Sequence, residues 1–100
     1  MKIFITESKL YETFKTVMDK FFGLTYHTKY RTYRGINVIK YEFLTREGNT
    51  FGTMEEDDVF FPSFSEYEKL DDLFGYKTDE LLLQYLRDKF GDEIIFRKIA

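Results

Sequence analysis

The chain has 100 residues, a net charge of −3 and no cysteine. This length suits one compact domain, 1–100, and is too short for two ordinary domains. Without cysteine there is no disulfide, no thiolate nucleophile and no cysteine-ligated metal. The twelve Phe and eight Tyr predict a small core built largely from aromatic rings.

The N-terminal quarter predicts a strand and then a helix. Residues 2–5 form a short apolar run, and Thr6 is a good N-cap for a helix that continues to about Phe22. Gly23 follows as the C′ residue, because it adopts a left-handed conformation without steric cost. Apolar side chains that recur at helical spacing predict the buried face: Leu10, Phe14, Val17, Met18, Phe21 and Phe22.

The next thirty residues predict an antiparallel meander of three strands. Residues 25–34 are rich in Thr and Tyr, which favour strands, and Gly35 interrupts the run. Residues 36–45 alternate between apolar and charged, and residues 50–54 follow a Gly/Asn turn at 46–49. In the middle strand the two faces are Ile39, Tyr41 and Phe43 on one side and Lys40 and Glu42 on the other.

The second half opens with an acidic loop at 55–58 and an apolar extended segment at 59–62. Ser63 and Glu66 then fit a capping box, in which each side chain bonds the other residue's backbone N–H. The helix that they start is expected to end at Gly75. Its inward side chains are predicted to be Tyr67, Leu70, Leu73 and Phe74.

Thr78 is predicted to cap a last helix that Gly91 ends, and residues 94–99 close the chain as a strand or an apolar tail. The apolar stripe of that helix is Leu82, Tyr85, Leu86 and Phe90, widened by Leu81 or Leu83. The element order is β-α-β-β-β-α-α-β. It predicts an α+β fold in which helices pack on one face of a small, mainly antiparallel sheet.

Residues with catalytic potential are few and scattered. His27 is the single histidine, whereas zinc hydrolysis needs several His, Cys or carboxylate ligands. No serine lies in a G-x-S-x-G elbow, and the acidic run 55–58 lacks the alternating pattern of a calcium loop. No phosphate loop or dinucleotide fingerprint is present. We therefore expect no catalytic residue, no metal site and no cofactor.

Charge is distributed unevenly along the chain. Residues 1–50 carry nine Lys/Arg and five Asp/Glu, a net +4, whereas residues 51–100 carry six and thirteen, a net −7. Such a split favours two partner surfaces of opposite sign, or self-association as a symmetric dimer or a head-to-tail array. The residues predicted to contact an acidic partner are Lys29, Arg31, Tyr33, Arg34 and Lys40. Those predicted to contact a basic partner are Glu55, Glu56, Asp57 and Asp58.

The leading interpretation is a non-enzymatic protein that binds a macromolecule, with a protein as the partner. One alternative is a nucleic-acid-binding module that uses residues 26–34, where cations would track phosphates and Tyr rings would stack on bases. In another, the acids of the second half mimic nucleic-acid phosphates toward a basic target. A small enzyme of unknown type is the third alternative.

The opening Met1-Lys2-Ile3-Phe4-Ile5-Thr6-Glu7-Ser8-Lys9-Leu10 resembles the openings of small proteins of tailed bacteriophages. The resemblance implies a viral or mobile-element origin and a role as a virion component or as an inhibitor of host or defence proteins. No apolar run approaches the ~20 residues of a membrane span, and the N-terminal run turns polar too early for a signal peptide. We therefore expect no membrane partner and a location in the host cytoplasm, or in the virion.

Overall fold

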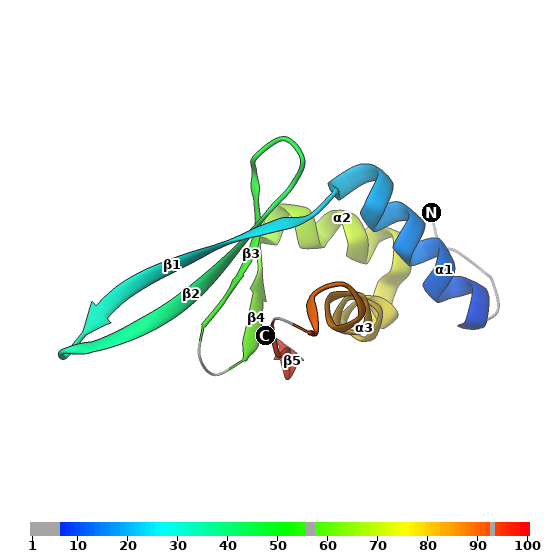
Figure 1. Cartoon of the computed structure of the whole chain (residues 1–100). Coiled ribbons are helices and arrows are strands. Elements are labelled where there is room, and N and C mark those ends of the chain that lie inside the picture. The colour runs from blue at the N-terminus through cyan, green and yellow to red at the C-terminus, as the bar shows by residue number, and fades with distance from the viewer. Residues whose placement is uncertain (1–6, 56–57, 93) are drawn as a thin grey trace.

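Five strands form one mixed sheet in the order β1-β2-β3-β4-β5, and the helices pack on one side of it (Figure 1). The computed structural model describes residues 7–55, 58–92 and 94–100, with the side chains of residues 7, 8, 31 and 33 left out. The first three pairings are antiparallel, and β4 and β5 pair in parallel. The strands are β1 Thr25–Tyr33, β2 Ile36–Leu44, β3 Thr50–Met54, β4 Val59–Pro62 and β5 Lys98–Ile99.

The predicted α+β fold and its mainly antiparallel sheet are confirmed. The predicted strand at 2–5 and the Thr6 cap lie outside the described residues. The apolar segment 59–62 is a true strand, and the C-terminal tail contributes a short one. The helical elements are α1 Glu7–Val17, its π-helical continuation η1 Met18–Phe22, α2 Phe64–Phe74, the 3₁₀ turn η2 Gly75–Lys77 and α3 Thr78–Phe90. Among the described helices, none is long and apolar enough to cross a bilayer.

The hairpin of β1 and β2 extends well beyond the rest of the sheet (Figure 1). Its strands have nine residues each, whereas β3 has five and β4 four. The shorter strands therefore back only the inner half of the hairpin, and the outer half projects from the body as a two-stranded ribbon. The molecule is accordingly elongated, with extents of 50 × 25 × 21 Å. We call residues 25–44 the arm.

Aromatic rings fill the core, as the composition predicts. The fully buried ring of Phe43, near the base of the arm, lies against Tyr26, Phe60, Phe90 and Phe96 at centroid distances of 5.3–5.9 Å. The contacts with Phe60 and Phe90 are edge-to-face, which adds about 0.5–1.5 kcal/mol each to the gain from burial. These rings join β1, β2, β4, α3 and the C-terminal segment into a single cluster.

A β-bulge at the β2–β3 pairing makes room for this cluster. Phe43 pairs with Gly52 and Leu44 pairs with Thr50, so Phe51 is the extra residue, and its ring is fully buried. Gly52 is required beside it because a Cβ there would lie 2.3 Å from Phe60 Cζ and 2.8 Å from the Phe61 carbonyl oxygen. The ring of Phe60 thus occupies the space that a side chain at position 52 would need.

The first helix ends in a π-turn that changes which phenylalanine is buried. The Gly23 N–H donates to the Met18 oxygen five residues earlier, at 2.9 Å. Buried side chains follow the spacing Phe14, Met18 and Phe22, so Phe21 turns outward and is 65% exposed. The prediction that Phe21 belongs to the buried face is therefore wrong. The prediction of Gly23 as a left-handed C′ residue is confirmed, with φ of +54°.

Arg46, from the β2–β3 turn, closes the end of this helix. Its guanidinium donates to the Lys20 and Asp19 carbonyl oxygens at 3.1 and 2.8 Å, and its backbone N–H donates to the Phe22 oxygen at 2.7 Å. These bonds satisfy carbonyl groups that a helix end leaves without partners. They also fix the point at which the chain enters β1.

The two predicted caps in the second half are not formed. The side chain of Ser63 makes no capping bond, and Glu66 is buried and faces Lys69 at 3.5 Å instead of completing a capping box. Thr78 is the first residue of α3 and makes no N-terminal cap; its buried hydroxyl donates to the Gly75 oxygen at 2.7 Å. The 3₁₀ turn that joins α2 directly to α3 gives this hydroxyl a carbonyl partner in place of a helix N–H.

We predict that Gly52→Ala lowers the free energy of unfolding by about 2–3 kcal/mol, because the added Cβ collides with a buried ring and with backbone. Gly48→Ala is the control. Gly48 has φ of +87° but open space around its Cβ position, so its loss is about 1 kcal/mol from backbone strain alone. Urea unfolding of both variants measures the difference. An equal or smaller loss for Gly52→Ala would contradict the packing described here.

Candidate functional site

The arm is a regular hairpin whose shape follows from its turn. Arg34 and Gly35 both have positive φ, +50° and +79°, as in the type I′ turn that matches the right-handed twist of paired strands. The register is continuous from Tyr33 opposite Ile36 to Thr25 opposite Leu44. Arg34 was predicted to end the strand; it instead lies in the turn, at the end of the arm farthest from the body.

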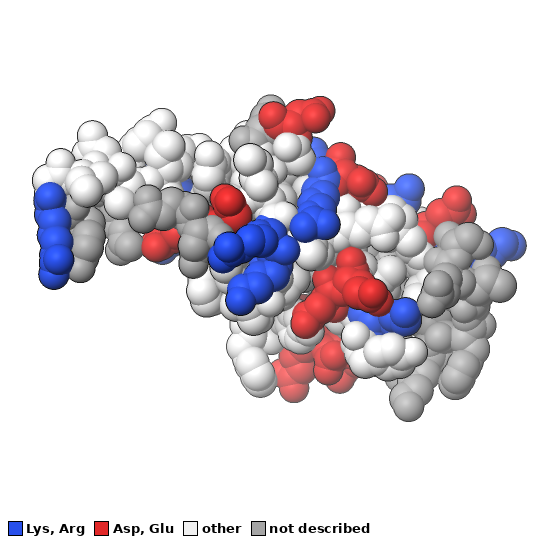
Figure 2. All heavy atoms as spheres, turned by 90° about the horizontal axis from the view of Figure 1, so that it is seen from below, with Lys and Arg blue, Asp and Glu red and all other residues white. Residues whose placement is uncertain are grey.

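The arm has a net positive charge, whereas the whole chain is negative. Residues 25–44 hold four Lys/Arg and one Glu, a net +3, so the remaining 80 residues have a net −6. Lys29 lies opposite Lys40, and its ammonium group pairs with Glu42 at 3.0 Å. Figure 2 shows a basic side chain at the free end of the arm, and both acidic and basic side chains over the body.

One face of the arm is apolar and reaches solvent. Tyr30 lies opposite Ile39, and these side chains are 72% and 38% exposed. They continue the face that carries Tyr26, Tyr41 and Phe43 at the base, where the helices cover it. The inner face of the sheet therefore extends past the helices that bury it, and these two apolar side chains stay partly exposed. Ile36, beside the turn, is 66% exposed but lies on the opposite face, with Lys40.

The structure places the predicted basic residues on one hairpin, and the acidic run begins after Met54, which pairs with Tyr41, the neighbour of Lys40. Lys29 and Lys40 lie on the arm and Arg34 at its tip; Arg31 and Tyr33 belong to β1 by their backbone, and their side chains are not described. The acidic run forms the β3–β4 connection. Its described residues, Glu55 and Asp58, are joined by a backbone hydrogen bond, and Glu56 and Asp57 lie outside the described residues.

Sequence reasoning did not single out Ile36 or Ile39 as exposed. Alternation placed Ile39 on the same face as Tyr41 and Phe43, and alternation does not show where the cover over that face ends. The available signal was length: strands of nine residues cannot be fully backed by neighbours of five and four.

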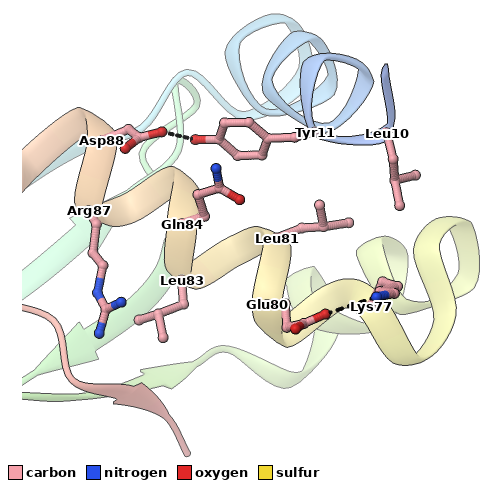
Figure 3. Close-up of a pocket in the computed structure, with 9 residues that line it drawn as sticks. All are labelled: Leu10, Tyr11, Lys77, Glu80, Leu81, Leu83, Gln84, Arg87 and Asp88. Carbon is pink, nitrogen blue, oxygen red and sulfur yellow. Dashed lines mark hydrogen bonds and ion pairs between the residues drawn. The ribbon is translucent and has the colours of Figure 1, made fainter. Parts of the chain in front are cut away.

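A hollow of about 530 Å³ lies between α1 and α3 (Figure 3). Its charged groups already have partners within the chain. Tyr11 donates to Asp88, Lys77 pairs with Glu80 at 3.2 Å, and Arg87 donates to the Phe96 oxygen at 3.0 Å. A catalytic or ligand-binding pocket usually presents polar groups that converge on open space. These groups instead bond to each other or to the backbone, so they do not converge on the open space of the hollow.

Other signs of chemistry are equally sparse in the described part of the chain. His27 is an exposed strand residue opposite Glu42, and no group of three His, Cys, Asp or Glu side chains there could hold a metal ion. Within that same part, every buried side-chain nitrogen or oxygen has a hydrogen-bond partner.

Three tyrosine–aspartate hydrogen bonds tie the helices together. Tyr85 of α3 donates to Asp19 of η1 at 2.5 Å, and Lys89 contacts both, at 3.1 Å from the phenol oxygen and 3.6 Å from the carboxylate. Burial and the neighbouring Asp19 carboxylate raise the pKa of Tyr85 well above its usual value. The pairs Tyr11–Asp88 and Tyr67–Asp79 make equivalent links from α1 and α2 to α3.

The chain matches no protein-family model, no curated protein and no solved structure. The functional interpretation of the arm therefore rests on its own residues: their exposure, charge and backbone pairing.

The tyrosine–aspartate links make stability sensitive to alkaline pH. Because the pKa of Tyr85 is raised by folding, the unfolded chain loses this proton first as the pH passes about 10. Its stabilising contribution is therefore present below pH 10 and is lost as the pH rises further. We predict that the free energy of unfolding falls less steeply above pH 10 in Tyr85→Phe than in the parent protein.

The matched control is Tyr76→Phe, since Tyr76 is 91% exposed. This variant should keep the parent's slope, and denaturant unfolding between pH 7 and 11 measures all three proteins. Superimposable slopes for the parent and Tyr85→Phe would refute the link between this tyrosine and alkaline instability.

Proposed function

We propose that this chain is a non-enzymatic interaction protein that binds a macromolecular partner through its arm. The observation that carries the proposal is the exposure of Tyr30, Ile36 and Ile39 on a ribbon whose base is fixed in the core. Large apolar side chains gathered on a projecting element are typical of interaction sites. Their burial by a partner contributes roughly 25 cal/mol for each Å² of apolar surface removed from water.

A protein partner fits the arm better than a nucleic acid. The apolar face has nothing to gain from a phosphate backbone, and the body, with its net −6, would repel one. Rings and aliphatic side chains beside cations suit a protein surface that combines apolar and acidic groups. The same reasoning leaves the acidic β3–β4 connection as a proposed second surface for a basic partner.

Nucleic-acid binding is the second candidate, and the shape of the arm favours it. A two-stranded ribbon fits the major groove of DNA, and the arm's net charge of +3 would attract phosphates. The exposed Tyr30 ring would offer a surface on which an unpaired base could stack.

The resemblance of the N-terminal residues to small phage proteins suggests a biological setting for the proposal. In that setting the chain would be a virion component or an inhibitor of a host or defence protein, acting in the host cytoplasm or within the virion. Both roles can be filled by binding alone, and every buried side-chain nitrogen or oxygen among the described residues already has a hydrogen-bond partner.

We expect the double variant Tyr30→Ala/Ile36→Ala to lose at least tenfold in recovery of the partner that co-purifies from cells producing the tagged chain. Both residues are exposed, so the variant should fold, and thermal unfolding verifies this. The matched control is Tyr76→Ala, an exposed tyrosine outside the arm, and it should retain full recovery.

Nuclease treatment separates the two candidate functions. A protein partner that survives nuclease and is lost with the arm variant supports the proposal. Recovery that nuclease abolishes favours the nucleic-acid candidate. A partner retained at full yield by the arm variant would show that binding uses another surface.

A further inference from the structure

We infer that the outer edge of β1 binds an extended acidic segment of a partner protein by strand addition. This inference rests on the proposed function, because it takes the arm as the binding element, and it adds the mode of binding and the chemistry of the partner. It follows from the edge position of β1, the orientation of its backbone, and the basic and apolar side chains on its two faces.

β1 is the outermost strand of the sheet, and within the described part of the chain it pairs only with β2. It is nine residues long and regular throughout, whereas the opposite edge, β5, has two residues. A long edge strand presents a row of backbone N–H and C=O groups that can pair with an added strand. β1 is therefore the one long edge that the described sheet offers.

The turn determines which residues of β1 direct their backbone groups outward. In a type I′ hairpin the two residues that flank the turn, here Tyr33 and Ile36, form a hydrogen-bonded pair. Hydrogen-bonded pairs alternate with non-bonded ones along an antiparallel ladder. Thr28, Tyr30 and Thr32 therefore lie in non-bonded pairs, and their N–H and C=O groups face away from β2.

The same strand is poorly suited to pair with a second copy of itself. In an antiparallel pairing of two β1 strands centred on Lys29, the ammonium groups of the two Lys29 residues would lie opposite each other. Like charges directly opposite each other destabilise a strand pair. Pairing between two copies of β1 is therefore disfavoured, whereas pairing with an acidic strand is not.

The two faces of the arm specify an alternating partner. Lys29 and Lys40 lie opposite each other on one face, and Glu42 pairs only with Lys29 among the described contacts. An added strand would lie next to β1, so its acidic side chains would face Lys29, whereas Lys40 is one strand farther away. On the other face, Tyr30 would be covered by apolar or β-branched side chains of the added strand. Because side chains alternate along a strand, the segment that fits carries acidic and apolar residues in turn.

The test uses a fluorescently labelled nine-residue peptide of alternating Glu and Val, with a Lys–Val peptide of the same length and a labelled oligothymidine as comparisons. Fluorescence anisotropy with the full chain measures affinity. We expect the Glu–Val peptide to bind at least tenfold more tightly than the Lys–Val peptide. Equal affinity for the two peptides, or binding of oligothymidine alone, would overturn the inference.

A proline at position 28 tests the role of the backbone. Thr28→Pro removes an outward N–H without removing a bond to β2, and Thr28→Ala is the matched control that keeps this N–H. We expect Thr28→Pro to weaken Glu–Val binding at least tenfold and Thr28→Ala less than threefold. Equal affinities for the two variants would show that no strand is added at this edge.

Hydrogen exchange on the parent protein gives an answer even if Thr28→Pro does not fold. The amides of Thr28, Tyr30 and Thr32 should become protected when the Glu–Val peptide binds, and unchanged exchange would overturn strand addition.

Recovery of the cellular partner distinguishes failure of strand addition from failure of the arm as the binding site. A partner lost with Tyr30→Ala/Ile36→Ala but kept by Thr28→Pro leaves the arm as the site and rejects strand addition. A partner kept by both variants rejects the arm itself.

Discussion

The packing of Phe43 is the interaction on which the rest of the structure depends. Its ring contacts Tyr26 on β1, Phe60 on β4, Phe90 on α3 and Phe96 near the C-terminus. An isolated two-stranded hairpin is at best marginally stable in water. Because Phe43 and Tyr26 are part of the arm, the cluster ties its two strands to the body, and the continuous ladder carries that order outward to the turn.

The arm exists because the strands differ in length. The helices and the shorter strands enclose the inner half of the hairpin, where the bulge at Phe51 and the bare Gly52 allow the rings to pack closely. Beyond that point Tyr30 and Ile39 remain 72% and 38% exposed. The same alternation of side chains that forms the core thus continues as an apolar surface. The proposed binding surface would need no loop rearrangement, since paired backbone holds it in place.

Charge determines which partners the arm would attract. The arm is positive and the body is negative, so the arm attracts acidic groups, while Lys29 disfavours pairing between identical strands. The helices, in contrast, are joined by neutral phenols that donate to aspartates, as in the Tyr85–Asp19 contact. In the body these polar contacts join separate helices, whereas on the arm Lys29 pairs with Glu42 of the neighbouring strand.

The sequence by itself determined the type and approximate limits of most elements and the grouping of the basic residues on one hairpin. Periodicity and alternation reflect side-chain direction, which is a local property, and Gly23 marked a helix end because only its backbone conformation mattered. The tertiary structure decided what depends on neighbours distant in sequence. It decided the parallel pairing of β4 with β5, the outward turn of Phe21 and the buried position of Glu66. It also decided the exposure of Tyr30 and Ile39, because alternation shows which face a residue occupies, whereas the length and packing of other elements determine whether that face is covered.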